Sequence, residues 1–123
     1  MQNLTIIKTS QIHDRGVFAN TDIKKNEIIE ICPVIVISKE DRLVLEKTII
    51  DEYAYQWGED SLCCAIALGN GSLYNHSYNP NAIYEKDFNA KILIIRAYEA
   101  IKAGAEIFIN YNMDPKDKSV LWF

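Results

Sequence analysis

Two stretches of the sequence carry the side chains that could do chemistry. Residues 69–81 read GNGSLYNHSYNPN and follow directly on the apolar run LCCAIAL. Asn, Gly, Ser and Pro are turn formers, and here they surround His76 together with Tyr74 and Tyr78. A plain surface loop has no need of these rings, so the stretch is a candidate functional site. The second stretch, residues 104–111, reads GAEIFINY and ends in Tyr111.

Two common enzyme classes fit the first stretch poorly. A dinucleotide-type fold would need a helix after the glycines, and Asn79 followed by Pro80 makes a helix improbable there. A hydrolase would pair Ser77 with His76, but neighbouring residues in an extended chain point to opposite faces and cannot readily bond to each other. Cys32, Cys63 and Cys64 form no C-x-x-C pair and indicate neither a disulfide framework nor a zinc site.

The two stretches together resemble a known family. Asn75-His76-Ser77 followed by Pro80-Asn81 resembles the NHS-x-x-PN signature of the SET domain family, S-adenosylmethionine-dependent methyltransferases that act on protein lysines. Residues 104–111 resemble the family's GEE-x-x-x-DY motif, at its usual distance downstream. The match extends from Gly16 to Tyr111. It implies a β-rich α+β fold of short sheets with one main helix, in which the two motifs meet in a knot-like crossing.

The resemblance also implies a set of site residues. Tyr111 would line the point where the cofactor's methyl group meets the substrate lysine, and would be the catalytic residue. S-adenosylmethionine would be bound by Arg15, Gly16, Val17, Phe18, Asn75, His76, Tyr111 and Trp122. The lysine channel would be lined by Tyr53, Tyr55, Tyr74, Ile109 and Phe123. The apolar Ile109 would leave room for a second or third methyl group on the product.

The sequence departs from the family pattern at several positions. Asp14 stands in place of a Gly, Ala105 in place of a Glu, and Asn110 in place of the Asp before Tyr111. Tyr78 replaces a Cys that helps to hold zinc in members with a cysteine-rich extension, so no metal is expected. Two functions therefore remain open: a protein-lysine methyltransferase, and a catalytically weak module that binds the cofactor or a basic peptide in a regulatory role.

Local patterns predict the elements that must position these residues. Ser38 is a good N-cap for a helix with an incomplete apolar face that ends near Asp51. Tyr53, Tyr55 and Trp57 alternate, so an extended segment would place all three rings on one face. Strands are predicted at 4–8, 28–37 (with Pro33 marking an edge, a bulge or a break), 82–86, 91–98 and 106–111. Residues 62–68 are predicted to form a buried strand or a tight helical turn.

Length and charge bound the remaining possibilities. A chain of 123 residues predicts a single domain, with 114–123 as a polar linker that ends in docking aromatic residues. A net charge of −4 disfavours direct binding of nucleic acid and permits a basic, lysine-containing protein segment as partner. No membrane-spanning run or secretion signal is apparent, so we expect a cytoplasmic protein without membrane contact. The terminal apolar residues could also mediate a homodimer.

Overall fold

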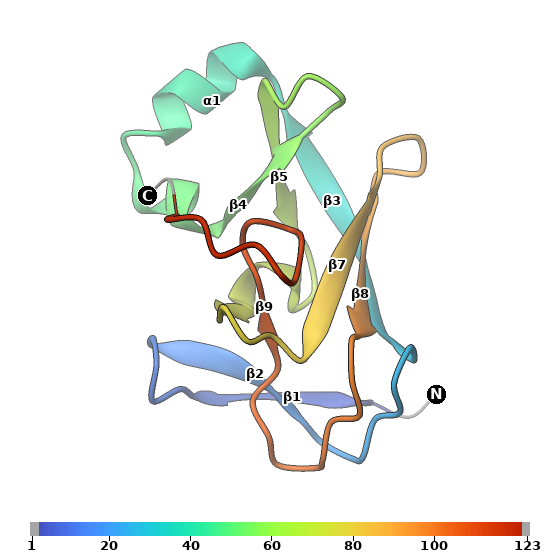
Figure 1. Cartoon of the computed structure of the whole chain (residues 1–123). Coiled ribbons are helices and arrows are strands. Elements are labelled where there is room, and N and C mark those ends of the chain that lie inside the picture. Colours follow the sequence, from blue (N-terminus) through green and yellow to red (C-terminus); the bar gives the residue numbers. More distant parts are fainter. Residues whose placement is uncertain (1–2, 122–123) are drawn as a thin grey trace.

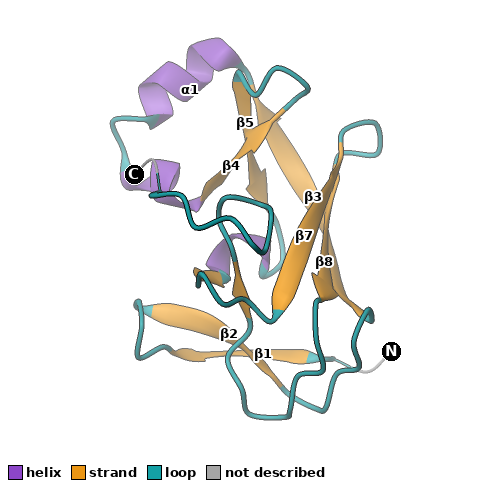
Figure 2. Cartoon of the chain, in the orientation of Figure 1, coloured by secondary structure: helices purple, strands orange, loops and turns teal. Residues whose placement is uncertain are grey.

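The chain forms mostly β-structure, with one short α-helix among the residues described (Figures 1 and 2). The computed structural model describes residues 3–121. In chain order the elements are β1 (Thr5–Thr9), β2 (Arg15–Ala19), β3 (Ile28–Ile37), α1 (Lys39–Leu45), the 3₁₀ turn η1 (Ile49–Tyr53), β4 (Ala54–Trp57), β5 (Cys63–Ala67), the 3₁₀ turn η2 (Gly71–Leu73), β6 (Asn75–His76), β7 (Ala82–Asp87), β8 (Ile92–Ala97) and β9 (Phe108–Ile109). Within 3–121, no helix is both long and apolar enough to cross a bilayer.

A five-stranded antiparallel sheet, in the order β4-β5-β3-β8-β7, forms the larger part of the fold. The central strand β3 changes partner at Pro33: residues up to Pro33 pair with β8, and those from Val34 pair with β5. Pro33 therefore lies within one continuous strand, and the register shift is found between Ile28 and Glu30 instead. Pro33 has no N–H to donate, but its carbonyl still accepts from the Leu68 N–H at 2.8 Å, and the Val34 N–H donates to the Lys91 carbonyl at 3.1 Å, so the strand stays paired on both sides of the proline.

The sheet curls until its two edge strands face each other. Tyr55 of β4 and Tyr84 of β7 are in edge-to-face contact, with ring centroids 5.1 Å apart. Trp57 and Phe88 make a second contact of the same kind, also at 5.1 Å. Figure 1 shows β4 and β7 on either side of the C-terminal segment. The predicted alternation of rings is confirmed for Tyr55 and Trp57, whereas Tyr53 ends the preceding 3₁₀ turn.

The β1–β2 hairpin packs against the segment that precedes β9. Val17 and Ala19 are buried in the core, and the Ala19 N–H donates to the Ala105 carbonyl at 2.8 Å. The hairpin loop closes through the Ser10 N–H, which donates to the Asp14 carbonyl at 2.9 Å. Asp14, which stands where the resemblance places a glycine, has a φ of 41°, in the left-handed region that favours glycine. Aspartate tolerates this conformation better than most residues, so the β1–β2 turn can form without glycine at this position.

The helix is shorter than the sequence predicts. Ser38 is its N-cap as expected, and its side chain accepts from the Asp41 N–H at 3.2 Å. The helix ends at Leu45 rather than near Asp51, because the Thr48 hydroxyl donates to the Leu45 carbonyl at 2.8 Å and a 3₁₀ turn comes next. None of the helical residues is buried, so little tertiary packing is present to extend it.

The remaining strand predictions are confirmed in outline. β7 and β8 form the expected hairpin, and the apolar run before Gly69 is β5. Only Phe108 and Ile109 of the predicted strand 106–111 are in a ladder, apart from an isolated bridge between Glu106 and Phe18. The β-rich α+β class with one helix is as predicted.

Candidate active site

The two motif segments meet side by side in a small parallel sheet. Asn75 pairs with Phe108, and His76 pairs with Ile109. The Ser77 N–H then donates to the Ile109 carbonyl at 3.0 Å. Segments more than thirty residues apart are therefore fixed to each other at the centre of the molecule, where both bring polar side chains.

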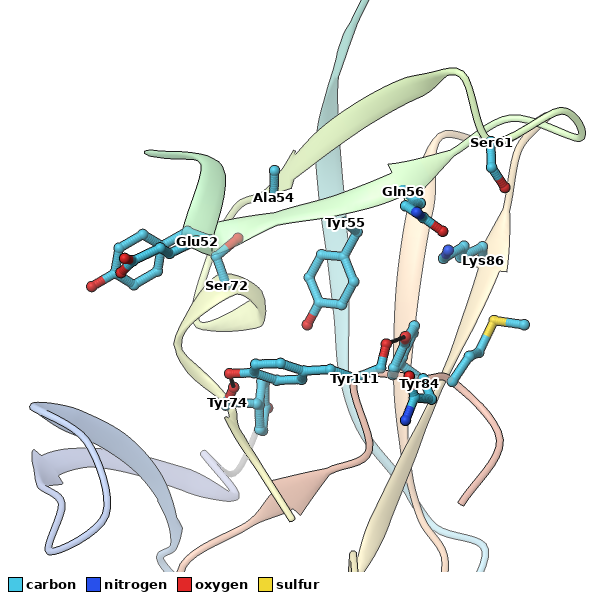
Figure 3. Close-up of a pocket in the computed structure, with 13 residues that line it drawn as sticks. Glu52, Ala54, Tyr55, Gln56, Ser61, Ser72, Tyr74, Tyr84, Lys86 and Tyr111 are labelled. Atoms are coloured by element: carbon cyan, nitrogen blue, oxygen red, sulfur yellow. Dashed lines mark hydrogen bonds between the residues drawn. The ribbon is translucent and has the colours of Figure 1, made fainter. Parts of the chain in front are cut away.

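Two neighbouring cavities lie near this junction and share some of their lining residues. The hairpin cavity, of about 360 Å³, lies against the β1–β2 loop and is lined by Ile12, His13, Asp14, Arg15, Glu52, Tyr53, Ser72, Leu73, Asn75, His76, Tyr111 and Leu121. The tyrosine cavity, of about 250 Å³, is lined by Glu52, Tyr53, Ala54, Tyr55, Gln56, Ser61, Ser72, Tyr74, Tyr84, Lys86, Tyr111, Asn112 and Met113 (Figure 3). Tyr111 belongs to both, so it lies where the two cavities adjoin.

Hydrogen bonds to backbone carbonyls hold the tyrosine rings in place. The Tyr111 hydroxyl donates to the Tyr74 carbonyl at 2.6 Å, and the Tyr84 hydroxyl donates to the Tyr111 carbonyl at 3.0 Å. The Tyr55 hydroxyl donates to the Gly71 carbonyl at 2.7 Å. Figure 3 shows the Tyr55 ring pointing toward Tyr111, whose own ring extends to the backbone of Tyr74. Each ring is thus anchored at its polar end, which keeps the walls of the tyrosine cavity rigid.

Burial, together with the smaller effects of the nearby Tyr53 and Glu106, raises the pKa of Tyr111 to about 12. Burial likewise raises the pKa of Tyr84. A phenol with so high a pKa keeps its proton at physiological pH. Tyr111 can therefore act as a hydrogen-bonding and positioning group, and it is unsuited to be a general base.

His76 connects the backbone of Tyr111 to the hairpin cavity. Its Nδ1 accepts from the Tyr111 N–H at 3.0 Å, so in the neutral ring the proton is on Nε2. Nε2 is buried and has no hydrogen-bond partner among residues 3–121. Burial lowers the pKa of His76 below its ordinary value, which favours this neutral form. A buried N–H without a partner, in a residue that lines a cavity, is a candidate ligand donor.

Asn75 fixes the β1–β2 loop over the hairpin cavity. Its side-chain amide donates to the carbonyls of His13 and Arg15 at 3.3 and 3.2 Å, and to Glu106 Oε2 at 2.8 Å. The other carboxylate oxygen of Glu106 accepts from the Ser10 hydroxyl at 2.8 Å. This network explains Gly16, because a Cβ there would lie 2.3 Å from the Glu106 carboxylate. Glycine is required at this position for the close approach of its neighbours and not for its backbone angle.

Most of the predicted site residues gather around the two cavities. Arg15, Asn75 and His76 line the hairpin cavity, Tyr55 and Tyr74 line the tyrosine cavity, and Tyr53 and Tyr111 line both. Gly16 is buried behind the β1–β2 loop through its contacts with Glu106 and Asn75. The predicted roles of Trp122 and Phe123 fall outside the described residues.

Besides Gly16, three predicted residues line neither cavity. Val17 is fully buried, because alternate residues of β2 face the core. Phe18, on the other face of β2, is half-buried and lies near Lys8, whose Nζ is 5.8 Å from the ring centroid. Ile109 is also fully buried, because its strand β9 passes through the core beside β6. The structure therefore places all three away from the proposed cofactor site and lysine channel.

The sequence did not identify Tyr84, Lys86, Glu52, Ser72 and Leu121, which the structure adds to the cavity walls. Tyr84 and Lys86 lie two residues apart in β7, so they share a face of the strand. That alternation was a signal that could have paired them, although nothing in the local sequence shows that β7 curls round to face β4. Within the described chain, no three His, Cys, Asp or Glu side chains form a group that could hold a metal ion.

Comparison with known proteins identifies this arrangement. The family model described as SET domain matches residues 14–112. The chain belongs to the SET domain family. A curated relative from Schizosaccharomyces pombe, described as a histone-lysine N-methyltransferase specific for H3 lysine-37, is 34% identical over 118 residues. That alignment covers 95% of this chain and 75% of the relative.

Solved structures share the SET fold. A crystal structure of a candidate histone methyltransferase from Plasmodium falciparum matches with a TM-score of 0.72 and 38% identity, over 90% of this chain and 95% of that one. A humanized mutant of Polycomb Repressive Complex 2 from Chaetomium thermophilum, bound to the inhibitor GSK126, matches with a TM-score of 0.75 and 21% identity, over 90% of this chain and 15% of that one. The complex bound to S-adenosylmethionine matches equally well. At this identity the complex shows the fold alone.

This SET domain chain is a protein-lysine methyltransferase, and S-adenosylmethionine is its methyl donor. The predictions of family, fold, activity, cofactor and protein substrate are confirmed. The hairpin cavity fits the cofactor on physical grounds. Its volume is within the ~300–1,000 Å³ typical of small-molecule sites, and its lining includes His76, whose Nε2 is a buried donor without a partner in residues 3–121.

Proposed function

We propose that the hairpin cavity holds S-adenosylmethionine, that the tyrosine cavity admits the substrate lysine, and that methyl transfer takes place beside Tyr111. The observation that carries this proposal is that Tyr111 lines both cavities. Methyl transfer is an in-line displacement, so the donor and the amine must approach from opposite sides of one point. Two adjoining cavities provide that geometry, and the main contribution of the protein is positioning.

The residues of the hairpin cavity have separate roles in this proposal. When bound, S-adenosylmethionine supplies a methyl group on a positively charged sulfur as the electrophile. His76 donates a hydrogen bond from Nε2, and Arg15 offers a cation to the carboxylate end of the cofactor. Asn75 has an indirect role, because its side-chain amide donates to the loop carbonyls of His13 and Arg15. It keeps the loop in the position from which Arg15 can act.

The residues of the tyrosine cavity prepare the lysine. An amine with a reference pKa of ~10.4 is almost entirely charged at pH 7, and only its neutral form has the lone pair that attacks. Walls made of Tyr53, Tyr55 and Tyr84 exclude water and so favour the neutral amine. The Tyr111 hydroxyl donates its own proton to the Tyr74 carbonyl, so its oxygen acts as an acceptor. An amine N–H bonded to that oxygen would have its lone pair directed toward the methyl group.

The proposed substrate is a basic, lysine-containing segment of a protein, of the histone type on which the Schizosaccharomyces pombe relative is described as acting. The net charge of −4 supports a basic partner. Direct binding of nucleic acid is not part of the proposal. A cytoplasmic location and a homodimer stay predictions from the sequence.

The proposal is tested with labelled S-adenosylmethionine, purified core histones and a mixed protein extract, followed by mass spectrometry of the labelled lysines. We expect label on lysine side chains that lie in basic segments. Binding of S-adenosylhomocysteine, measured by calorimetry, distinguishes the alternatives. A chain that binds this product but labels nothing would be a binding module, and one that does not bind it would contradict the assignment of the hairpin cavity.

A further inference from the structure

The segment after β9 turns back and is fastened to the loop that comes after β6. Two donors meet on one carbonyl: the Tyr78 hydroxyl and the Asn112 side-chain amide donate to the Ser119 carbonyl at 2.9 and 2.8 Å. The Lys118 ammonium donates in turn to the Tyr78 carbonyl. The chain is thus gripped from both sides at Ser119, and we name these contacts the Ser119 clamp.

Asn110 holds the base of the same turn. Its buried side-chain amide donates to the Asp117 carbonyl at 2.6 Å, and its side-chain oxygen accepts from the Asn112 N–H at 3.0 Å. An aspartate at this position would have no N–H to donate, and its charge would face the carbonyl oxygen. The asparagine is therefore matched to the path of the C-terminal segment, and it lines neither cavity.

The clamp controls the position of Leu121, two residues beyond Ser119. Leu121 lines the hairpin cavity together with His76 and Tyr111. Val120 is 89% exposed, whereas Leu121 is half-buried, so the apolar packing of these two residues comes from Leu121. Tyr78 also packs edge-to-face on the His76 ring, with centroids 4.4 Å apart. The hydrogen bonds at Ser119 fix the backbone two residues before Leu121 and so help to place its side chain against the cavity.

We propose that the Ser119 clamp sets the C-terminal segment as a wall of the cofactor cavity, so that Tyr78 is a positioning residue for cofactor binding. This rests on the proposed function, in which the hairpin cavity holds S-adenosylmethionine. If only the clamped state binds tightly, the apparent dissociation constant rises in inverse proportion to the clamped fraction. Loss of one hydrogen bond changes such an equilibrium by ~2–10-fold.

The first experiment compares Tyr78→Phe with the wild type. Phenylalanine keeps the ring contact with His76 and removes only the donor to Ser119. We expect the dissociation constant of S-adenosylhomocysteine, measured by calorimetry, to rise by ~2–10-fold, with faster tryptic cleavage after Lys116 and Lys118. Tyr98→Phe is the matched control, because Tyr98 lines a shallow cleft beside the same segment and makes no side-chain hydrogen bond among residues 3–121.

A second pair of variants shows whether Tyr78 acts through the segment. Truncation after Ser119 removes Leu121, so we expect weak binding and no further loss when Tyr78→Phe is added to the truncated chain. An effect of Tyr78→Phe that persists after truncation would mean that Tyr78 acts through His76, and the clamp would be overturned. Equal affinity of the wild type and Tyr78→Phe in the full chain would overturn it too. Failure of the wild type to bind S-adenosylhomocysteine would instead contradict the proposed function.

Discussion

The backbone N–H of Tyr111 donates to Nδ1 of His76 at 3.0 Å, and this bond joins the two motifs at the wall shared by the cavities. It forms only when Nδ1 carries no proton. The same bond therefore positions Tyr111 and leaves the Nε2 of His76 as a donor. The imidazole of His76 thus holds the backbone of the proposed catalytic residue through Nδ1 and offers Nε2 to the proposed cofactor.

The His76 bond predicts a stability that depends on pH. Burial lowers the pKa of His76 in the folded state below the ordinary value of 6.5. Its contribution to stability is therefore fully present above pH 6.5 and is lost as the pH falls through the lower, folded pKa. We expect His76→Asn, which retains an acceptor but does not titrate, to show a smaller fall in melting temperature between pH 7 and pH 5 than the wild type. Equal slopes for the two proteins would contradict the assigned tautomer.

Tyr111→Phe should abolish most methyl transfer while leaving the binding of S-adenosylmethionine nearly unchanged. The ring is kept, and what is lost is the hydroxyl that donates to the Tyr74 carbonyl and is proposed to orient the amine. Loss of one such contact in a dry site costs ~10²–10³ in rate, whereas a purely structural hydroxyl would cost ~0.5–1.5 kcal/mol of stability. Single-turnover rate and melting temperature separate the two. A less stable variant with an undiminished rate would show that the hydroxyl is structural.

The site residues that the sequence predicted most directly are those in the two short polar motifs. Asn75, His76 and Tyr111 lie in short polar motifs whose residue types have few other uses, so they could be found without a structure. The walls of the tyrosine cavity were harder to predict. Tyr55 and Tyr84 face each other only because the sheet curls through five strands, and no local pattern encodes that curl. The end of α1 was missed because the Leu45 carbonyl accepts from both the N–H and the hydroxyl of Thr48, and the apolar pattern does not encode these local bonds.

Ile109 is a predicted channel residue that the structure buries away from both cavities. Its place two residues before Tyr111 suggested a role in the channel, but the side chain is fully buried beside β6. A larger ring there would overpack the core, at a cost of ~1–3 kcal/mol. We therefore expect Ile109→Tyr to lower the melting temperature markedly, whereas Ile109→Val is mildly destabilising. A stable Ile109→Tyr protein that only changes the number of methyl groups transferred would restore the prediction from the sequence.

Tyr84 is predicted to position Tyr111 through a hydrogen bond to its backbone. Its hydroxyl donates to the Tyr111 carbonyl at 3.0 Å, and its ring packs on Tyr55. Tyr84→Phe removes only the hydrogen bond, so we expect a several-fold lower kcat with little change in cofactor affinity. Tyr98→Phe again provides the matched control, since no cavity beside Tyr111 includes that residue. If kcat is unchanged and only the melting temperature falls, Tyr84 is a structural residue.

Lys86 places a positive charge in the wall that the substrate lysine must pass. It is half-buried, lies with its ammonium 5.8 Å from the Tyr84 ring centroid, and makes no ion pair among residues 3–121. Burial lowers its pKa, so the folded state binds this proton less readily than the unfolded chain. The stability associated with Lys86 therefore increases as the pH rises and is lost as the pH falls. Lys86→Met should remove that penalty at pH 7.

The same substitution should help a basic substrate, because it removes a like charge from the tyrosine cavity. We expect Lys86→Met to lower the KM for a basic peptide several-fold at low salt, with a smaller difference at high salt, where charges are screened. Lys102→Met is the control, since Lys102 is exposed and lines neither cavity. The variant should also melt at a higher temperature than the wild type at pH 7, and the gap should narrow toward pH 10. An increased KM for Lys86→Met would mean that the ammonium attracts the substrate, through an acidic residue beside the target lysine.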